Sequence, residues 1–197
     1  MKNAFLTHSI NFIALNKNGL SDEEREKLAY GLEGIYLTVT KAIIIFLLAI
    51  ILNFVKEFVI TLILFNIIRY PGFGFHATKS TVCLISSTLL ILGLPYLFTH
   101  IEIPLIVKIL LCIISCVCFI IFAPADTVKR PLTNKKKRKI RKICASCLAF
   151  IYSFIVIYFD KMMISNLTLA ALVIETIFIS PIMYSIFKES YNNYKKV

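Results

Sequence analysis

The sequence is short of charged residues: only 17% of its 197 residues are Asp, Glu, Lys or Arg, whereas 58% are hydrophobic. A soluble domain of this length needs a more polar surface, so the composition excludes an ordinary soluble enzyme and indicates an integral membrane protein. The first 20 residues lack the charged start, apolar core and small-residue cleavage site of a signal peptide. Internal repeats and an appended soluble domain are also lacking, so we expect one membrane domain over residues 1–197.

The six cysteines do not form the pattern of a metal site. Cys144 and Cys147 make a single CxxC pair, with no second pair and no histidines at ligand spacing. A structural zinc site needs four ligands, so this pair alone is a weak signal. Most of the cysteines lie in or beside apolar runs, where a thiol packs as a small apolar group. We therefore expect no metal and no cofactor.

Apolar runs dominate the chain from residue 36 onward. A helix needs about 20 residues to cross a bilayer. Six runs are candidates: 36–55, 58–70, 80–98, 103–123, 143–159 and 166–187. The second, 58–70, is short and needs local thinning of the bilayer or help from the flanking loop. The sequence thus predicts an all-α, polytopic integral membrane protein with about six transmembrane helices in a core over residues 36–187.

The N-terminal region, residues 1–35, predicts interfacial amphipathic helices rather than a membrane span. Apolar residues of the first helix, such as Phe5 and Ile10, fall on one helical face. Ser21 and Glu24 have the spacing of a capping box, which satisfies unpaired amides at a helix start. A second helix is therefore expected to begin near residue 22, and residues 188–197 are expected to be a cytoplasmic tail.

The basic residues decide the orientation. The formal charge of +11 would suit a nucleic-acid partner, but the basic residues cluster between apolar runs, so no nucleic acid is expected. All but three of the 22 basic residues fall in the N-terminal region, the 69–79 and 124–142 loops and the tail; the exceptions are Lys56, Lys108 and Lys161. The positive-inside rule then predicts a multi-pass protein of the cell membrane with both termini and both of these loops in the cytoplasm.

One polar segment, residues 69–83, interrupts the apolar runs. It contains Arg69, Pro71, Gly72, Gly74, His76 and Cys83. Proline removes a hydrogen bond from a helix and glycine weakens it, so this segment is expected to break the second transmembrane helix. Non-helical backbone at this depth must line protein or water, which suits a substrate groove.

His76 and Cys83 are the candidate base and nucleophile. On one straight helix they would lie about 10 Å apart along the axis, too far for direct proton transfer, so a bend between Gly74 and Cys83 is required. Ser80 is among the candidate caps of the next helix, and a cap there would place Cys83 in its first turns, where the helix dipole favours a thiolate. The alternative is a buried cysteine and an interfacial histidine.

Three further charged residues leave alternatives open. Asp126 is expected either to orient the His76 imidazole or to act as a turn carboxylate. Glu175 is the only acid well inside an apolar run, which makes it a functional candidate. It would pair with Lys108 or with a positive substrate group, or be a protonated carboxyl bonded to a neighbouring helix; Lys108 would otherwise extend to the membrane surface.

Two motifs in order carry a family resemblance. They comprise Arg69, Gly72, Gly74, His76-Ala77 and Cys83, followed by Ala123-Pro124-Ala125-Asp126-Thr127 and Pro131. Over about residues 20–187 the chain resembles the accessory gene regulator B (AgrB) family of membrane cysteine endopeptidases. Two glycines are often adjacent in that family, whereas Phe73 separates them here.

The resemblance implies a specific reaction. The protein would cleave an AgrD-like precursor peptide on its C-terminal side and close it into a thiolactone quorum-sensing signal, with Cys83 as nucleophile and His76 as base. Arg69 and Gly74 match positions that matter for activity or substrate engagement. A homodimer in the lipid bilayer is implied, and the basic run 135–142 would dock the precursor's acidic tail as well as contact anionic lipid.

Two other classes of function remain open from the residues alone. One is a small transporter or channel-like protein, in which Glu175 and Lys108 are intramembrane charges along a permeation path. The other is a non-catalytic membrane scaffold. A thiolate at Cys83 separates these from the protease, because only the protease requires it.

Overall fold

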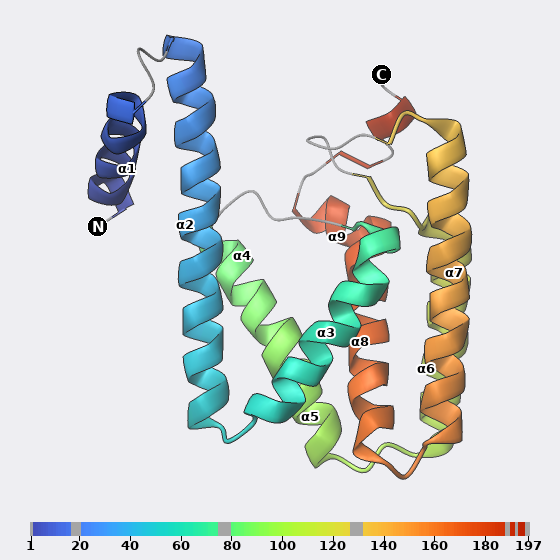
Figure 1. Cartoon of the computed structure of the whole chain (residues 1–197). Helices are drawn as coiled ribbons and strands as arrows, with labels where there is room; N and C mark the ends of the chain where they lie inside the picture. The colour runs from blue at the N-terminus through green and yellow to red at the C-terminus, as the bar shows by residue number, and fades with distance from the viewer. Residues whose placement is uncertain are drawn as a thin grey trace. The chain divides into compact units, whose positions relative to one another are not determined.

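The computed structural model describes residues 2–16, 21–74, 80–126, 132–187, 190–191 and 193–195, and every regular element in them is a helix (Figure 1). The elements are α1 (Lys2–Asn16), α2 (Asp22–Ile51), α3 (Val55–Gly72), α4 (Ser80–Ser87), the π-helical η1 (Thr88–Gly93), α5 (Leu94–His100), α6 (Leu105–Phe122), α7 (Lys135–Tyr158), α8 (Met163–Ile179), α9 (Pro181–Ile186) and the 3₁₀ turn η2 (Asn193–Lys195). The predicted all-α class is confirmed.

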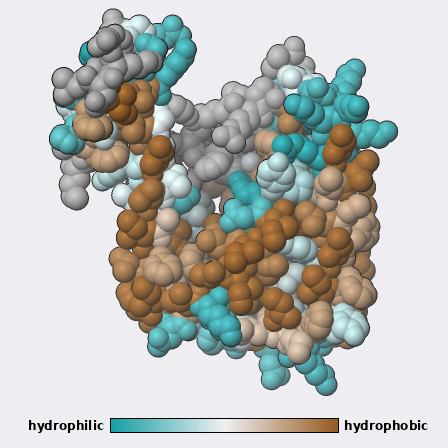
Figure 2. Space-filling view, in the orientation of Figure 1, coloured by the Kyte–Doolittle hydropathy of each residue, from teal (hydrophilic) through white to brown (hydrophobic). Residues whose placement is uncertain are grey.

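Several of these helices are suited to a membrane. Among the described residues, α2, α6 and α7 are long and apolar enough to cross one, and shorter apolar helices cover Leu84–His100 and Met163–Ile179. On the face of the second unit shown in Figure 2, apolar side chains cover most of the middle of the helices and hydrophilic residues gather at their ends. The chain is a membrane protein; six crossings with cytoplasmic termini stay a prediction.

The last predicted run, 166–187, is two helices rather than one. Ser180 has an extended backbone (φ −66°, ψ 134°), and its hydroxyl accepts a hydrogen bond from the Ile182 amide at the start of α9. Pro181 occupies the first turn, where its missing N–H is not needed. The Ser-Pro pair in the sequence therefore marks a helix boundary that hydropathy alone does not detect.

The chain divides into two compact units, residues 1–51 and 52–197. In the first unit the Phe5 ring lies 5.2 Å from that of Tyr36, so α1 packs on α2. The predicted capping box is confirmed, because the Glu24 amide donates to the Ser21 hydroxyl (3.3 Å) and the Ser21 amide donates to the Glu24 carboxylate (3.1 Å). The expectation of one domain over the whole chain stays a prediction.

In the second unit the core is centred on α8, which contacts α3, α5, α6 and α7. Its side chains are buried along nearly its whole length; fully buried examples are Leu167, Leu169, Leu172 and Ile174. Ala170 and Ala171, also fully buried, let neighbouring helices approach closely. This burial brings the middle of α8, with Glu175, against the end of α3.

Candidate functional site

The candidate site begins where α3 ends. The helix stops at Gly72, Phe73 and Gly74 take the positive φ values of 67° and 84°, and helical structure resumes at Ser80. Residues 69–83 are therefore not one straight helix, and the predicted interruption is confirmed. Pro71 lies inside the last turn of α3, where it removes one backbone donor.

Cys83 lies in the first turn of α4, as expected. Ser80 is the first residue of that helix. His76 falls in 75–79, outside the described residues, and the side chains of Ser80 and Cys83 are also outside them. The pairing of His76 with Cys83 therefore stays a prediction.

A two-bond bridge joins the two motifs that lie some 50 residues apart in sequence. The Gly74 amide donates to the Ala125 carbonyl (2.9 Å), and the Ala125 amide donates to the Gly72 carbonyl (3.0 Å), so Phe73 and Ala125 form an isolated parallel bridge. The loop charges predicted that both motifs lie at one membrane surface, but not that their backbones are hydrogen bonded. The bridge fixes the direction in which the chain leaves α3.

Arg69 and Glu175 form an ion pair directly beside this bridge. The Arg69 Nη1 atom lies 3.1 Å from the Glu175 Oε2 atom, and the Glu175 side chain is fully buried whereas that of Arg69 is 22% exposed. The guanidinium lies near the rings of Phe65 (5.3 Å) and Phe178 (4.8 Å), and these two rings contact each other with their centroids 5.9 Å apart. Arg69 is thus held against α8 rather than free in a loop.

The suggested pairing of Glu175 with Lys108 is wrong. Lys108, 3% exposed, forms an ion pair with Asp160 (2.9 Å) and donates to the Asp160 carbonyl (2.6 Å) and the Ser165 hydroxyl (3.2 Å). It therefore ties α6 to the turn between α7 and α8, and its extension to the membrane surface stays a prediction. Glu175 lies in the C-terminal half of α8 and faces Arg69 at the end of α3.

Both glycines of the segment are needed for close packing. A Cβ atom on Gly72 would lie 2.7 Å from the Glu175 Oε1 atom, which has no hydrogen-bond partner among the described residues. A Cβ on Gly74 would lie 3.1 Å from the Phe178 Cβ and 3.2 Å from Arg69 Nη1, and its φ of 84° disfavours any side chain. A side chain at either position would push against the ion pair or its aromatic cover.

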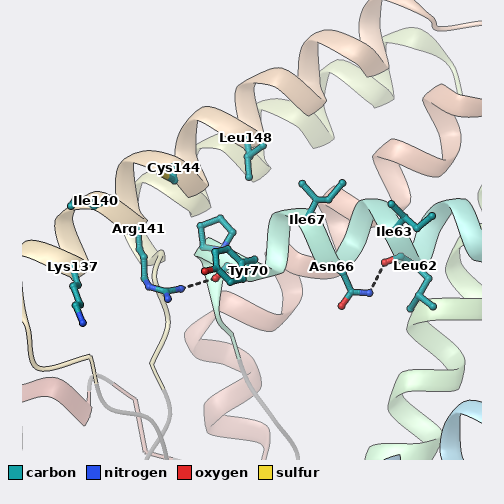
Figure 3. A pocket seen from close by; sticks show the side chains of 11 residues that line it. Leu62, Ile63, Asn66, Ile67, Tyr70, Lys137, Ile140, Arg141, Cys144 and Leu148 are labelled. Carbon is teal, nitrogen blue, oxygen red and sulfur yellow. Dashed lines mark hydrogen bonds between the residues drawn. The ribbon is translucent and has the colours of Figure 1, made fainter. Parts of the chain in front are cut away.

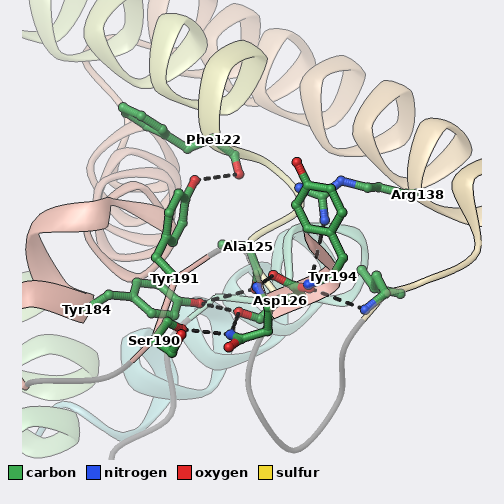
Figure 4. Close-up of polar contacts among 10 residues, drawn as sticks. Phe122, Ala125, Asp126, Arg138, Tyr184, Ser190, Tyr191 and Tyr194 are labelled. Carbon is green, nitrogen blue, oxygen red and sulfur yellow. Dashed lines mark hydrogen bonds and ion pairs between the residues drawn. The ribbon is translucent and has the colours of Figure 1, made fainter. Parts of the chain in front are cut away.

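Asp126 organises the other side of the bridge. Its carboxylate, 1% exposed, accepts from the backbone amides of Leu132 (3.3 Å), Asn193 (3.2 Å) and Tyr194 (2.8 Å), as Figure 4 shows for Tyr194. Arg138 adds a long ion pair at 3.9 Å. The carboxylate therefore orders the described part of the C-terminal tail, and its predicted role in orienting His76 is not required to explain its burial.

Tyr184 on α9 is a residue that the sequence gave no reason to select. Its buried hydroxyl lies 3.2 Å from both the Ala125 and the Asp126 carbonyls (Figure 4). It therefore holds the 123–126 segment through the Ala125 carbonyl, which also accepts from the Gly74 amide. A tyrosine at the end of an apolar run is common enough that no sequence signal marks it.

Within the described part of the chain, no group of three or more His, Cys, Asp or Glu residues is placed so that it could hold a metal ion. The described residues of the site supply the Arg69 guanidinium, paired with Glu175, and the hydrogen-bonded backbone groups of Gly72, Gly74 and Ala125.

Comparisons with known proteins point to one family. The model of the accessory gene regulator B family matches residues 7–179. The chain is similar to the accessory gene regulator protein B of Staphylococcus epidermidis, with 26% identity over 91% of this chain and 90% of the relative. It is also similar to AgrB-like proteins of Listeria innocua (29% identity; 93% and 91%) and Clostridium acetobutylicum (29% identity; 92% and 88%). No solved structure matches the chain.

Proposed function

Because this chain belongs to the accessory gene regulator B family, we propose that it is a membrane cysteine endopeptidase that cleaves a precursor peptide and cyclises it into a thiolactone signal. The family gives the chain a role in the accessory gene regulator quorum-sensing system. The proposal adds the reaction, an AgrD-like precursor as substrate, and Cys83 and His76 as the catalytic pair. It includes a site on the cytoplasmic side and a homodimeric assembly.

The observation that carries the proposal is the fixed break between α3 and α4. The bridge between Phe73 and Ala125 and the ion pair between Arg69 and Glu175 hold the end of α3, and Cys83 follows in the first turn of α4. Backbone amides at a helix start and the helix dipole stabilise a thiolate there. A catalytic pair needs rigid supports on both sides, and these contacts supply them on the α3 side.

The proposed chemistry proceeds through two acyl transfers. His76 accepts the Cys83 thiol proton, the thiolate attacks the scissile carbonyl carbon, and the C–N bond breaks as His76 returns the proton to the leaving amine. The precursor is now a thioester on Cys83. A cysteine thiol of the precursor then gives its proton to His76 and attacks this thioester, which closes the ring and releases the Cys83 thiolate. One thioester replaces another, so exclusion of water matters more than further activation.

Arg69 is a supporting residue in this scheme. Its guanidinium is held by Glu175 and two aromatic rings, yet 22% of its side chain stays exposed. A cation in that position suits a carboxylate or a developing negative charge on the precursor. Gly74 supports it by letting the backbone pass within van der Waals distance of the guanidinium.

The test uses membranes containing the full chain and a candidate AgrD-like precursor. Mass spectrometry follows the released C-terminal fragment, a thioester on Cys83 and the cyclic product. We expect all three with the wild type and none with Cys83→Ala. Cys147→Ala is the matched control, because Cys147 is an exposed cysteine of α7 and should leave all products unchanged. Equal product from Cys83→Ala and the wild type would refute the proposal.

The transporter alternative loses its main support. It rested on Glu175 and Lys108 as intramembrane charges of a permeation path, but each is engaged with an oppositely charged side chain, Arg69 and Asp160. These two ion pairs have a local structural explanation. No described contact favours a permeation path over the protease.

A further inference from the structure

A groove outside the α3–α4 break runs between α3 and α7. It has a volume of about 980 Å³ and is open along one side. The two helices contribute facing walls, and Figure 3 shows Arg141 of α7 directed at Tyr70 of α3 with the other lining side chains along the same channel. None of the lining side chains takes part in the proposed reaction itself.

The groove changes character along its length. Its inner part is mostly apolar, with Ile63 and Ile67 on α3 and Leu148 on α7; the polar member is Asn66, whose side-chain amide donates to the Leu62 carbonyl (2.7 Å). Its outer end carries two cations, Lys137 and Arg141, which are four residues apart and therefore share one face of α7. A ligand that fits this pattern has a long apolar part and an anionic end.

The length of the groove matches one leaflet of a bilayer. From Lys137 to Leu148 the helix rises by about 16 Å, at about 1.5 Å for each residue. Half of the hydrocarbon core of a bilayer is about 15 Å thick. An acyl chain that starts at the level of the cations would therefore reach the apolar inner end.

The cationic end is pre-organised. The Arg141 Nη1 atom donates to the Tyr70 carbonyl (2.7 Å), and its guanidinium lies over the Phe73 ring at 4.4 Å. A guanidinium has five N–H donors, and the bond to Tyr70 uses one of them. Lys137 is exposed at the same end, and the surrounding run 135–142 is basic at every position but Ile140, which raises the local positive potential.

We propose that this groove binds one anionic phospholipid, with its phosphate between Lys137 and Arg141 and an acyl chain along Ile67, Cys144 and Leu148. Basic pockets between transmembrane helices recognise anionic headgroups by this combination of charge and depth. An acidic peptide would satisfy the two cations, but it would leave the apolar inner part without a partner. The proposal concerns binding and does not depend on the proposed catalytic function.

The first test is native mass spectrometry of the purified full chain with phosphatidylglycerol and with phosphatidylcholine of identical acyl chains. We expect one retained phosphatidylglycerol and weaker retention of phosphatidylcholine. Lys137→Gln should weaken phosphatidylglycerol binding by about fivefold, the effect of one cation at a lipid surface. Lys139→Gln is the matched control, because Lys139 is exposed in the same basic run but does not line the groove.

The second test uses two cysteines as internal reporters. Cys144 lines the groove and Cys147 does not, although both are exposed thiols of α7. In phosphatidylglycerol nanodiscs, alkylation of Cys144 should be slower than in phosphatidylcholine nanodiscs, while alkylation of Cys147 should not change. Peptide mapping distinguishes the two sites.

Three results would overturn the proposal. One is equal retention of the two lipids. Another is an equal loss from Lys137→Gln and Lys139→Gln, which would mean attraction to the whole basic run. The last is displacement of bound phosphatidylglycerol by an acidic peptide that also protects Cys144, which would assign the groove to a peptide.

Discussion

The ion pair between Arg69 and Glu175 gives a quantitative prediction. Arg69→Met removes the positive partner of a carboxylate that is fully buried, whereas Glu175→Met leaves a guanidinium that is 22% exposed. Breaking a buried pair by removing one partner is destabilising by about 3 kcal/mol or more, because the remaining charge is uncompensated. We expect that full loss for Arg69→Met and a smaller one for Glu175→Met.

The double variant Arg69→Met/Glu175→Met should recover most of the stability lost by Arg69→Met. Replacing both members of a buried pair by apolar residues of similar size is often close to neutral. For a chain of this length about 3 kcal/mol corresponds to a fall in Tm of about 6–12 °C. The double variant should therefore melt several degrees above Arg69→Met.

A thiol-reactive dye is a suitable probe for this measurement. The chain contains no tryptophan, but once the exposed Cys144 and Cys147 have been blocked by alkylation of the folded chain, the dye reports on Cys112 and Cys116, which are 2% and 8% exposed. The control pair is Glu23 and Lys27, whose side chains are 76% and 74% exposed at an N–O distance of 2.6 Å. Lys27→Met should change stability by no more than about 0.5 kcal/mol.

The result that would refute the reasoning is simple additivity. If the double variant is as unstable as the sum of the two single variants, the two side chains do not interact in the membrane protein. If Arg69→Met melts like the wild type, the carboxylate of Glu175 does not depend on Arg69. Recovered stability without recovered peptide processing would, in contrast, support a role of Arg69 beyond packing.

Three further predictions concern the supports of the break. Gly74→Ala should destabilise the chain by about 1–2 kcal/mol, because its φ is 84° and the new Cβ would lie 3.1 Å from that of Phe178; the same melting assay measures this. Tyr184→Phe should cost about 1 kcal/mol in the same assay, since it removes the hydroxyl that donates to the Ala125 and Asp126 carbonyls. Asp126→Ala should release the tail from its amide contacts, so limited proteolysis should cut near residues 190–195 much faster than in the wild type, and an unchanged rate would contradict this.

The sequence was sufficient for features that depend on neighbouring residues. The capping box at Ser21 and Glu24 is local chemistry, and its predicted bonds are present. The end of α3 at Gly72 follows from proline and glycine preferences, which also act within a few residues. The start of α9 after Ser180 also depends on neighbouring residues only, and the Ser180-Pro181 pair in the sequence is enough to predict a helix start there.

Features that depend on the rotation of helices about their axes were not predictable in the same way. The sequence suggested Lys108 or a positive substrate group as the partner of Glu175, whereas the structure pairs it with Arg69, because loop charges do not specify which face of α8 meets which helix. The bridge between Phe73 and Ala125 depends on where two loops meet after the helices of the second unit have packed. Hydropathy sets the depth of each segment in the membrane, but packing sets its neighbours.

The three contacts at the end of α3 act on different atoms of the same turn, and together they hold it in place. Arg69 is held through its side chain by α8, Tyr70 through its carbonyl by Arg141 of α7, and Gly72 through its carbonyl by Ala125. A single contact would leave the turn able to rotate about it, whereas three contacts in different directions fix both its position and its orientation. A nucleophile and a base that must meet within hydrogen-bond distance gain from such a fixed start, because a misplacement of about 1 Å can lower a rate a hundredfold. The polar segment that interrupts the apolar runs is therefore anchored at its beginning by residues from α7, from α8 and from the second motif.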